Sequence, residues 1–167
     1  MKSLIAAIAV LAVFAPASPS ALAHGDEKHA KPAKSRPIST EEHSFGRQGD
    51  PKKVSRNVTV DMSDAMRFSP SEIRVKQGET IRFVAKNGGK VMHEMVLGNL
   101  AELKAHGEMM KKFPNMEHDE PYMAHVPPGT KQEIVWTFTK AGEFHYGCLL
   151  PGHLEAGMIG KIIVAGK

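Results

Sequence analysis

Three residues near the C-terminus have side chains that bind copper, and they stand within one short segment. Cys148, His153 and Met158 follow the spacing C-x4-H-x4-M. One thiolate, two imidazoles and a weak axial thioether are the ligands that tune a protein-bound copper ion for one-electron chemistry. The second imidazole must come from elsewhere in the chain, and His93 is the candidate. The sequence therefore predicts a mononuclear copper site of His93, Cys148, His153 and Met158.

Each of these residue types also has an ordinary structural use. A free cysteine often behaves as a small buried hydrophobe, and methionine fills irregular gaps in cores. Cys148, however, is the only cysteine in the chain and follows an alternating segment, while Pro151 and Gly152 form a turn that can bring His153 back towards it. The combination favours ligation over packing. A single thiol also excludes the kind of dinuclear copper centre that needs two thiolates in one loop.

The order of the ligands resembles that of the cupredoxins, the family of type 1 copper proteins that includes azurin and plastocyanin. The spacing within the loop is similar to that of rusticyanin and auracyanin. The resemblance implies that His93, Cys148 and His153 surround the copper ion in one plane, with Met158 as the axial ligand. It further implies that the fold is a cupredoxin-like Greek-key β-sandwich.

Groups next to the ligands tune sites of this kind. The resemblance implies that the backbone N–H groups of Glu94 and Leu150 donate hydrogen bonds to the sulfur of Cys148. Many family members carry asparagine immediately after the first histidine, where its side chain ties the two ligand loops together. Here the residue is Glu94. Because a carboxylate cannot donate in this way, we expect water or another residue to remake the tie.

The part of the chain from residue 55 to residue 167 reads as one all-β domain with one short helical insertion. Its short alternating segments, separated by turn residues, are typical of a β-sandwich. Phe144, Tyr146 and Cys148 share one side of a segment, which places Cys148 inside the sandwich and His145 on the outer side. The expected strands are residues 58–62, 73–76, 81–85, 91–97, 134–138, 144–148 and 158–164.

The helical insertion is expected at residues 99–112. Asn99 can cap its N-terminus, with Glu102 completing a capping box, and Leu100, Leu103 and Met110 can form its apolar stripe. We expect an irregular stretch at residues 113–129. Soft and imidazole ligands are concentrated in this part of the chain: His106, Met109, Met110, Met116, His118, Met123 and His125.

These seven residues support two interpretations. Thioethers select cuprous copper and imidazoles accept either oxidation state, so the group can form a second copper site for additional, weaker copper ions. Alternatively, the methionines pack the helix and loop against the sandwich.

The N-terminal region divides into two parts. Residues 1–23 have a short basic start, an apolar run and the cleavage site Ala21-Leu22-Ala23, which predict a secretory signal peptide cleaved after Ala23, with no membrane span left afterwards. Residues 24–54 are polar and broken by prolines and glycines, as expected of a flexible arm. The arm carries His24, His29 and His43, which either bind copper weakly or belong to a solvated linker.

Composition and charge exclude several classes of function. The net charge of +4 with histidines neutral is mild, and because nucleic-acid binding needs a clustered basic face, we expect no nucleic-acid partner. Copper enzymes that contain this type of domain need a second one or further copper centres, so we expect no catalytic residues and, at most, oxidation of cuprous ions.

Two functions fit the expected copper centre. In the first, the protein acts in the periplasm in tolerance to excess copper. The segments 92–95 and 111–118 resemble a periplasmic cupredoxin subgroup associated with copper resistance. The alternative is an electron shuttle, in which a redox partner docks near His153 on a patch of Leu149, Leu150, Pro151 and Leu154.

Overall fold

The computed structural model describes residues 37–113 and 119–167. The expected signal peptide, His24, His29, Met116 and His118 lie outside these residues. The described chain belongs to the compact unit that spans Arg36–Lys167. Within the described ranges, no helix has the length and apolar character that crossing a membrane requires.

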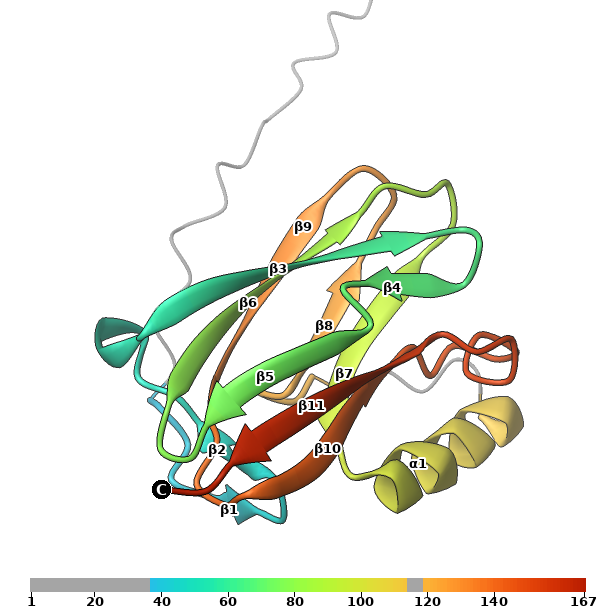
Figure 1. The fold of residues 1–167 in the computed structure, drawn as a ribbon. Coiled ribbons are helices and arrows are strands. Elements are labelled where there is room, and N and C mark those ends of the chain that lie inside the picture. Colours follow the sequence, from blue (N-terminus) through green and yellow to red (C-terminus); the bar gives the residue numbers. More distant parts are fainter. Residues whose placement is uncertain (1–36, 114–118) are drawn as a thin grey trace, which may run out of the picture. The chain divides into compact units, whose positions relative to one another are not determined.

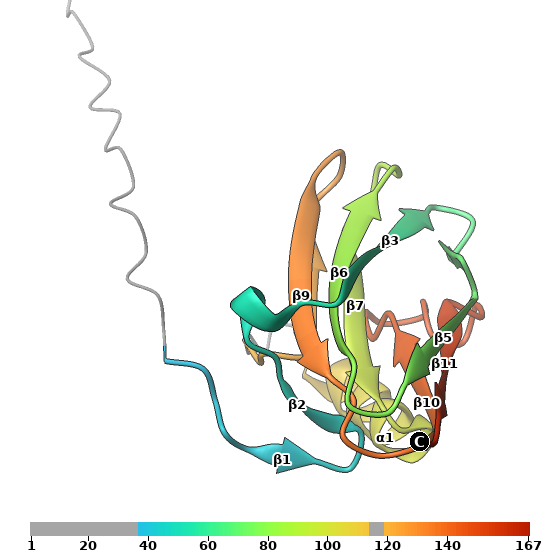
Figure 2. The same cartoon turned by 60° about the vertical axis from the view of Figure 1, so that its left-hand side comes forward.

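Two β-sheets face each other to form a sandwich (Figures 1 and 2). The first sheet has the strand order β1-β2-β9-β6-β3-β4 and the second has the order β5-β11-β10-β7-β8. Neighbouring strands are antiparallel except in the pairs β3–β6 and β5–β11, which are parallel. The strands of the first sheet are β1 (Glu42–His43), β2 (Gly46–Gln48), β3 (Arg56–Ser63), β4 (Arg67–Ser69), β6 (Thr80–Asn87) and β9 (Lys131–Thr137). The strands of the second are β5 (Glu72–Lys76), β7 (His93–Gly98), β8 (Met123–Val126), β10 (Gly142–Gly147) and β11 (Ile159–Ala165).

The core between the sheets follows from the two-residue period of the strands. On β10, Phe144 and Tyr146 face inward as predicted, and Cys148 continues this side just beyond the strand. His145 lies on the other side and is half-buried. The largest fully buried side chains of the sandwich include Trp136, Tyr146, Phe83 and Phe138. The all-β sandwich predicted from the sequence is therefore confirmed.

All seven expected strands are present, but the stretch expected to be irregular also contains one. Residues 123–126 form β8, which pairs antiparallel with β7 along the register His93↔Val126 to Val96↔Met123. Met123, Ala124 and Val126 are buried. Three of its four side chains are therefore buried, and the strand lacks the regular alternation that marks half-buried strands.

The helical insertion is α1 (Leu100–Lys112), and its predicted cap is present. The Asn99 side chain accepts from the N–H of Glu102 at 2.9 Å, and the Glu102 carboxylate accepts from the N–H of Asn99 at 3.3 Å. Leu103 and Met110 are buried as expected. Leu100 is 37% exposed, so the prediction that it belongs to the apolar stripe is wrong. Gly107 occupies the buried face instead.

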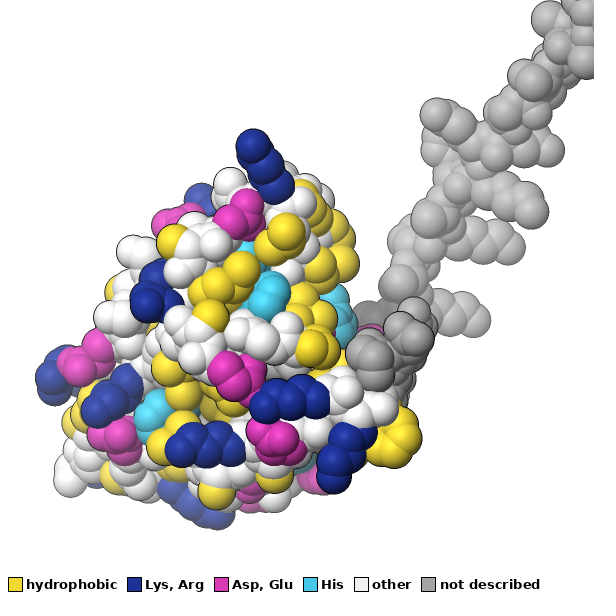
Figure 3. Space-filling model, turned by 90° about the vertical axis from the view of Figure 1, so that its right-hand side faces the viewer, with side chains coloured by type: hydrophobic (Ala, Val, Ile, Leu, Met, Phe, Trp, Pro, Cys, Tyr) yellow, Lys and Arg dark blue, Asp and Glu magenta, His cyan; other side chains and the backbone are white. Residues whose placement is uncertain are grey.

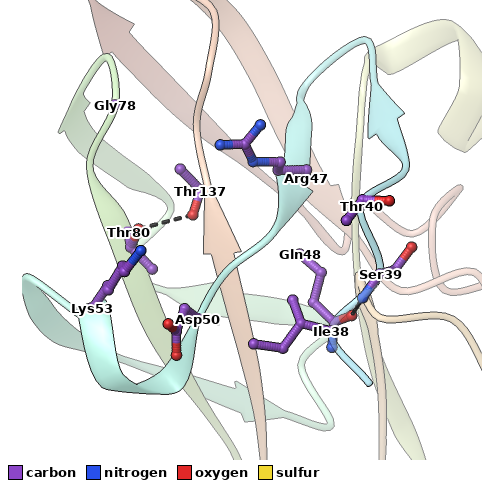
Figure 4. Close-up of a pocket in the computed structure, with 10 residues that line it drawn as sticks. All are labelled: Ile38, Ser39, Thr40, Arg47, Gln48, Asp50, Lys53, Gly78, Thr80 and Thr137. Carbon is purple, nitrogen blue, oxygen red and sulfur yellow. Dashed lines mark hydrogen bonds between the residues drawn. The ribbon is translucent and has the colours of Figure 1, made fainter. Parts of the chain in front are cut away.

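The N-terminal segment differs from the expected flexible arm. Residues 42–48 form β1 and β2 at the edge of the first sheet, and Pro51–Lys53 form a short 3-10 helix. Phe45 is 3% exposed and stacks on Trp136, whose indole N–H donates to the Phe45 carbonyl at 3.0 Å. Figure 4 shows how this segment lies beside Thr80 and Thr137 around a cavity of about 530 Å³, which none of the expected copper ligands lines. The packed chain therefore begins well before residue 55.

Candidate copper centre

The expected ligands come together at one end of the second sheet. His93 is the first residue of β7, Cys148 directly follows β10, and His153 and Met158 stand in the loop between β10 and β11 (Figure 1). One ligand atom from each of His93, Cys148 and His153 lies within 4.8 Å of the other two. The Sγ of Cys148 is 3.1 Å from Nδ1 of His153. Met158 is fully buried in the same core cluster as Cys148.

The ligand loop is closed by its own backbone. The N–H of His153 donates to Leu150, the N–H of Met158 donates to His153, and the N–H of Cys148 donates to Met158, at 3.0, 3.0 and 3.1 Å. Gly152 has a φ of +87°, a conformation that glycine adopts without the steric cost of a side chain. Pro151 and Gly152 thus form the turn that returns His153 to the cysteine, as the sequence predicted.

The donor atoms suit a copper ion. His93 is fully buried, its Nε2 lies against Asp64, and its Nδ1 has no hydrogen-bond partner among the described residues. A buried nitrogen without a partner is costly unless something binds it, and a metal ion at Nδ1 would satisfy it. Burial lowers the pKa of His153, which favours the neutral imidazole that binds metals. The soft sulfur and two imidazoles are the donor set expected for copper.

Two backbone donors reach the cysteine sulfur. The N–H of Glu94 donates to Cys148 Sγ at 3.3 Å, and the N–H of Leu150 also donates to it, as the resemblance implied. Burial nevertheless raises the pKa of the Cys148 thiol to about 12. The thiol is therefore protonated in the metal-free protein at neutral pH, and copper must displace that proton when it binds.

Asp64 holds the outer side of His93, a role that the sequence did not reveal. Its carboxylate accepts from the N–H of Lys90 at 2.8 Å and lies 3.3 Å from Nε2 of His93. The Lys90 N–H is the main reason why the pKa of Asp64 is lowered. A carboxylate on the second nitrogen fixes the ring and makes the imidazole a stronger ligand. Asp64 is one acidic residue among many in the sequence, with no motif around it.

We expect Asp64→Ala to weaken copper binding by about ten- to a hundredfold, as is usual when an outer partner of a ligand histidine is lost. The reason is that the ring of His93 loses its orienting carboxylate and the preceding loop loses an anchor. Competitive titration against a copper chelator measures the effect. Asp61→Ala, an exposed position on β3, is the matched control. Equal affinity in the two variants would contradict this role for Asp64.

Asn87 ties the His93 loop to its neighbours. This buried residue donates from Nδ2 to the carbonyls of Val91 and Val126, both at 2.8 Å, and its Oδ1 accepts from the N–H of Gly89 at 2.8 Å. No motif in the sequence singles out Asn87 for this role. Its amide braces the segment before His93, and the Glu94 side chain does not take part in this tie.

The structure describes six of the residues expected at secondary copper sites, and three of them pack against apolar or aromatic side chains. Met110 and Met123 are buried with Val96, Leu103 and Leu149 in a second apolar cluster. His43 packs against Phe45, Tyr122 and Trp136.

The other three residues expected at secondary copper sites, His106, Met109 and His125, lie partly or fully at the surface. His106 and the exposed Met109 line, together with His43, a cavity of about 520 Å³. His125 pairs with Glu94. Within residues 37–113 and 119–167, the only group of three His, Cys, Asp or Glu ligand atoms close enough to share one ion is that of His93, Cys148 and His153.

The surface beside the site is apolar. Figure 3 looks onto this end of the sandwich and shows hydrophobic side chains gathered around histidine at the surface. His153, Leu150 and Leu154 are half-buried, Pro151 is exposed, and Met92 adds an exposed thioether. Leu149 does not belong to this surface, because it is 1% exposed and packs in the second apolar cluster.

A Greek-key type sandwich with a buried Cys and two His at one end defines a copper protein of the cupredoxin class. The chain belongs to the plastocyanin/azurin family of copper binding proteins, whose family model matches residues 54–165.

Relatives and solved structures agree with this assignment. The chain is 46% identical to the copper-resistant cuproprotein CopI of Rubrivivax gelatinosus over 98% of this chain and 99% of that protein. It is 35% identical to CopI of Pseudomonas aeruginosa over 72% of this chain and 82% of that protein. Among solved structures, auracyanin of Roseiflexus castenholzii has a TM-score of 0.58 at 20% identity, covering 67% of this chain and 98% of that one, and this likeness concerns the fold alone.

Proposed function

We propose that the protein acts in the periplasm in tolerance to excess copper, through one copper ion held by His93, Cys148, His153 and Met158. The observation that carries the proposal is the cluster of His93, Cys148 and His153, in which a buried imidazole nitrogen without a partner adjoins a buried thiol. The high identity to a copper-resistant cuproprotein along nearly its whole length supports the role in tolerance.

Each residue has a definite part in such a centre. Bound copper supplies one-electron redox chemistry. The N–H groups of Glu94 and Leu150 would hold the Cys148 thiolate, Asp64 would orient His93, and the fully buried Met158 would offer a weak thioether ligand. His93, Cys148 and Met158 are fully buried, so they would hold the ion away from bulk water.

Export to the periplasm forms part of the same proposal. It rests on the predicted signal peptide of residues 1–23, which precedes a chain whose single thiol is explained by metal ligation rather than by a disulfide.

An electron shuttle is the second candidate, and one observation favours it. His153 is half-exposed and surrounded by the apolar side chains of Leu150, Pro151 and Leu154, which is the type of surface that a redox partner can cover. A shuttle of this kind would transfer its electron through the exposed edge of the imidazole.

Growth of a deletion strain over a series of copper concentrations distinguishes the two. We expect normal growth in trace copper, poor growth in excess copper, and rescue by the wild-type protein but not by Cys148→Ser, with both present at equal levels in periplasmic extracts. Respiration is measured in parallel. Unchanged copper sensitivity together with impaired electron flow at every copper level would overturn the tolerance role and support the shuttle.

A further inference from the structure

A buried carboxylate lies beside the copper ligands. Glu94 is 2% exposed, although acidic side chains are rarely buried unless they are paired. It stands directly opposite His125 in the pairing of β7 with β8, and its Oε1 is 3.0 Å from Nδ1 of that histidine. Its Oε2 is buried and has no hydrogen-bond partner within the described ranges. The carboxylate is therefore fixed in place but only half satisfied.

The position of Glu94 couples its charge to the site. It follows the ligand His93 in the chain, and its own N–H donates to Cys148 Sγ at 3.3 Å. Glu94 and Cys148 are both buried, at 2% and 0% exposure. Charges in a buried region are screened less than in water, so the charge of the Glu94 carboxylate can act on a metal ion held by these ligands.

We propose that Glu94 sets the redox balance of the copper centre by lowering its reduction potential, with His125 holding the carboxylate in place. A nearby negative charge stabilises the doubly charged cupric ion more than the singly charged cuprous ion. Gain of one electron by the metal is therefore disfavoured. Outer groups and the polarity around a site are known means of tuning its potential. The inference rests on the proposed function only in that it requires copper at His93, Cys148 and His153.

The effect of the Glu94 charge on the reduction potential can be distinguished from a purely structural role of its side chain. If Glu94 served only to brace β7 against β8, its shape and hydrogen bond would matter and its charge would not. Substitutions that remove the charge while keeping size, and one that keeps the charge while shortening the side chain, separate the two roles.

The test measures the reduction potential of copper-loaded Glu94→Gln, Glu94→Asn and Glu94→Asp by redox titration of the visible absorption band. Glu143→Gln, which removes an exposed carboxylate at the far end of β10, is the control. We expect the Gln and Asn variants to favour cuprous over cupric copper by about tenfold relative to the wild type, a rise of about 59 mV for one electron. Glu94→Asp and Glu143→Gln should stay close to the wild type.

Two results would overturn the inference. One is a potential in Glu94→Gln and Glu94→Asn equal to that of Glu143→Gln, and the other is a common shift in all three Glu94 variants, which would indicate bracing alone. If Glu94→Gln does not fold, the Asn variant, which carries the residue common at this position in the family, gives the same comparison. Absence of the visible band from the wild type would instead contradict the proposed copper site itself, so the two failures are distinguishable.

Discussion

Replacing Cys148 by serine is expected to abolish the strong visible absorption of the copper-loaded protein and to remove most of its affinity for copper. The thiolate is the soft, electronically dominant ligand of such a centre. A serine hydroxyl loses its proton far less readily and offers a hard oxygen in a site where Cys148 is fully buried. Visible spectra and copper content of the wild type and the variant, loaded in parallel, measure the effect.

Met158→Leu is the matched comparison. Leucine preserves the buried volume at a position that is fully buried in the wild type. It would remove only the weak thioether ligand, so the visible band should persist while the potential shifts. Full colour in Cys148→Ser, or loss of colour in Met158→Leu but not in Cys148→Ser, would contradict the roles assigned to these ligands.

Replacing Phe45 by alanine is expected to destabilise the folded domain by about 3–5 kcal/mol, the usual cost of removing a large buried aromatic side chain. Phe45 is 3% exposed, stacks on Trp136 and contacts the edge of Tyr122. The free energy of unfolding from denaturant titration measures the effect.

Ile38→Ala is the control for this substitution, because Ile38 belongs to the same N-terminal segment but is 43% exposed. We expect it to change stability by no more than about 0.5 kcal/mol. Equal stability of the two variants would show that the segment adds nothing to the sandwich and would restore the flexible arm expected from the sequence.

The N-terminal segment shows why the sequence left part of the fold unrecognised. Strands of two and three residues are too short for an alternation to be visible, and a single phenylalanine between polar residues does not indicate burial. Phe45 is buried because a distant strand provides Trp136 to receive it. The long strands that alternate over five or more residues carried enough signal, and each was found.

The copper centre was likewise predictable from the sequence only in part: its ligands were, and the residues that support them were not. A thiol, an imidazole and a thioether in one loop are an unusual combination, so Cys148, His153 and Met158 could be chosen as ligands from the sequence. The structure brings ligand atoms of His93, Cys148 and His153 within 4.8 Å of one another. Asp64 and Asn87 escaped notice because acids and amides are common and act here only through contacts that the fold creates. Met110 and Met123 show the opposite case, because their thioethers suit copper but are packed in a buried apolar cluster.

Stepwise titration of the metal-free protein with copper, recording visible absorption and bound copper together, tests the copper centre most directly. We predict a strong thiolate band that grows in proportion to the first equivalent of copper and then stops, with no such band in Cys148→Ser treated in the same way. A wild-type protein that binds copper without colour, or that shows the same band when Cys148 is replaced, would contradict the centre formed by His93, Cys148, His153 and Met158.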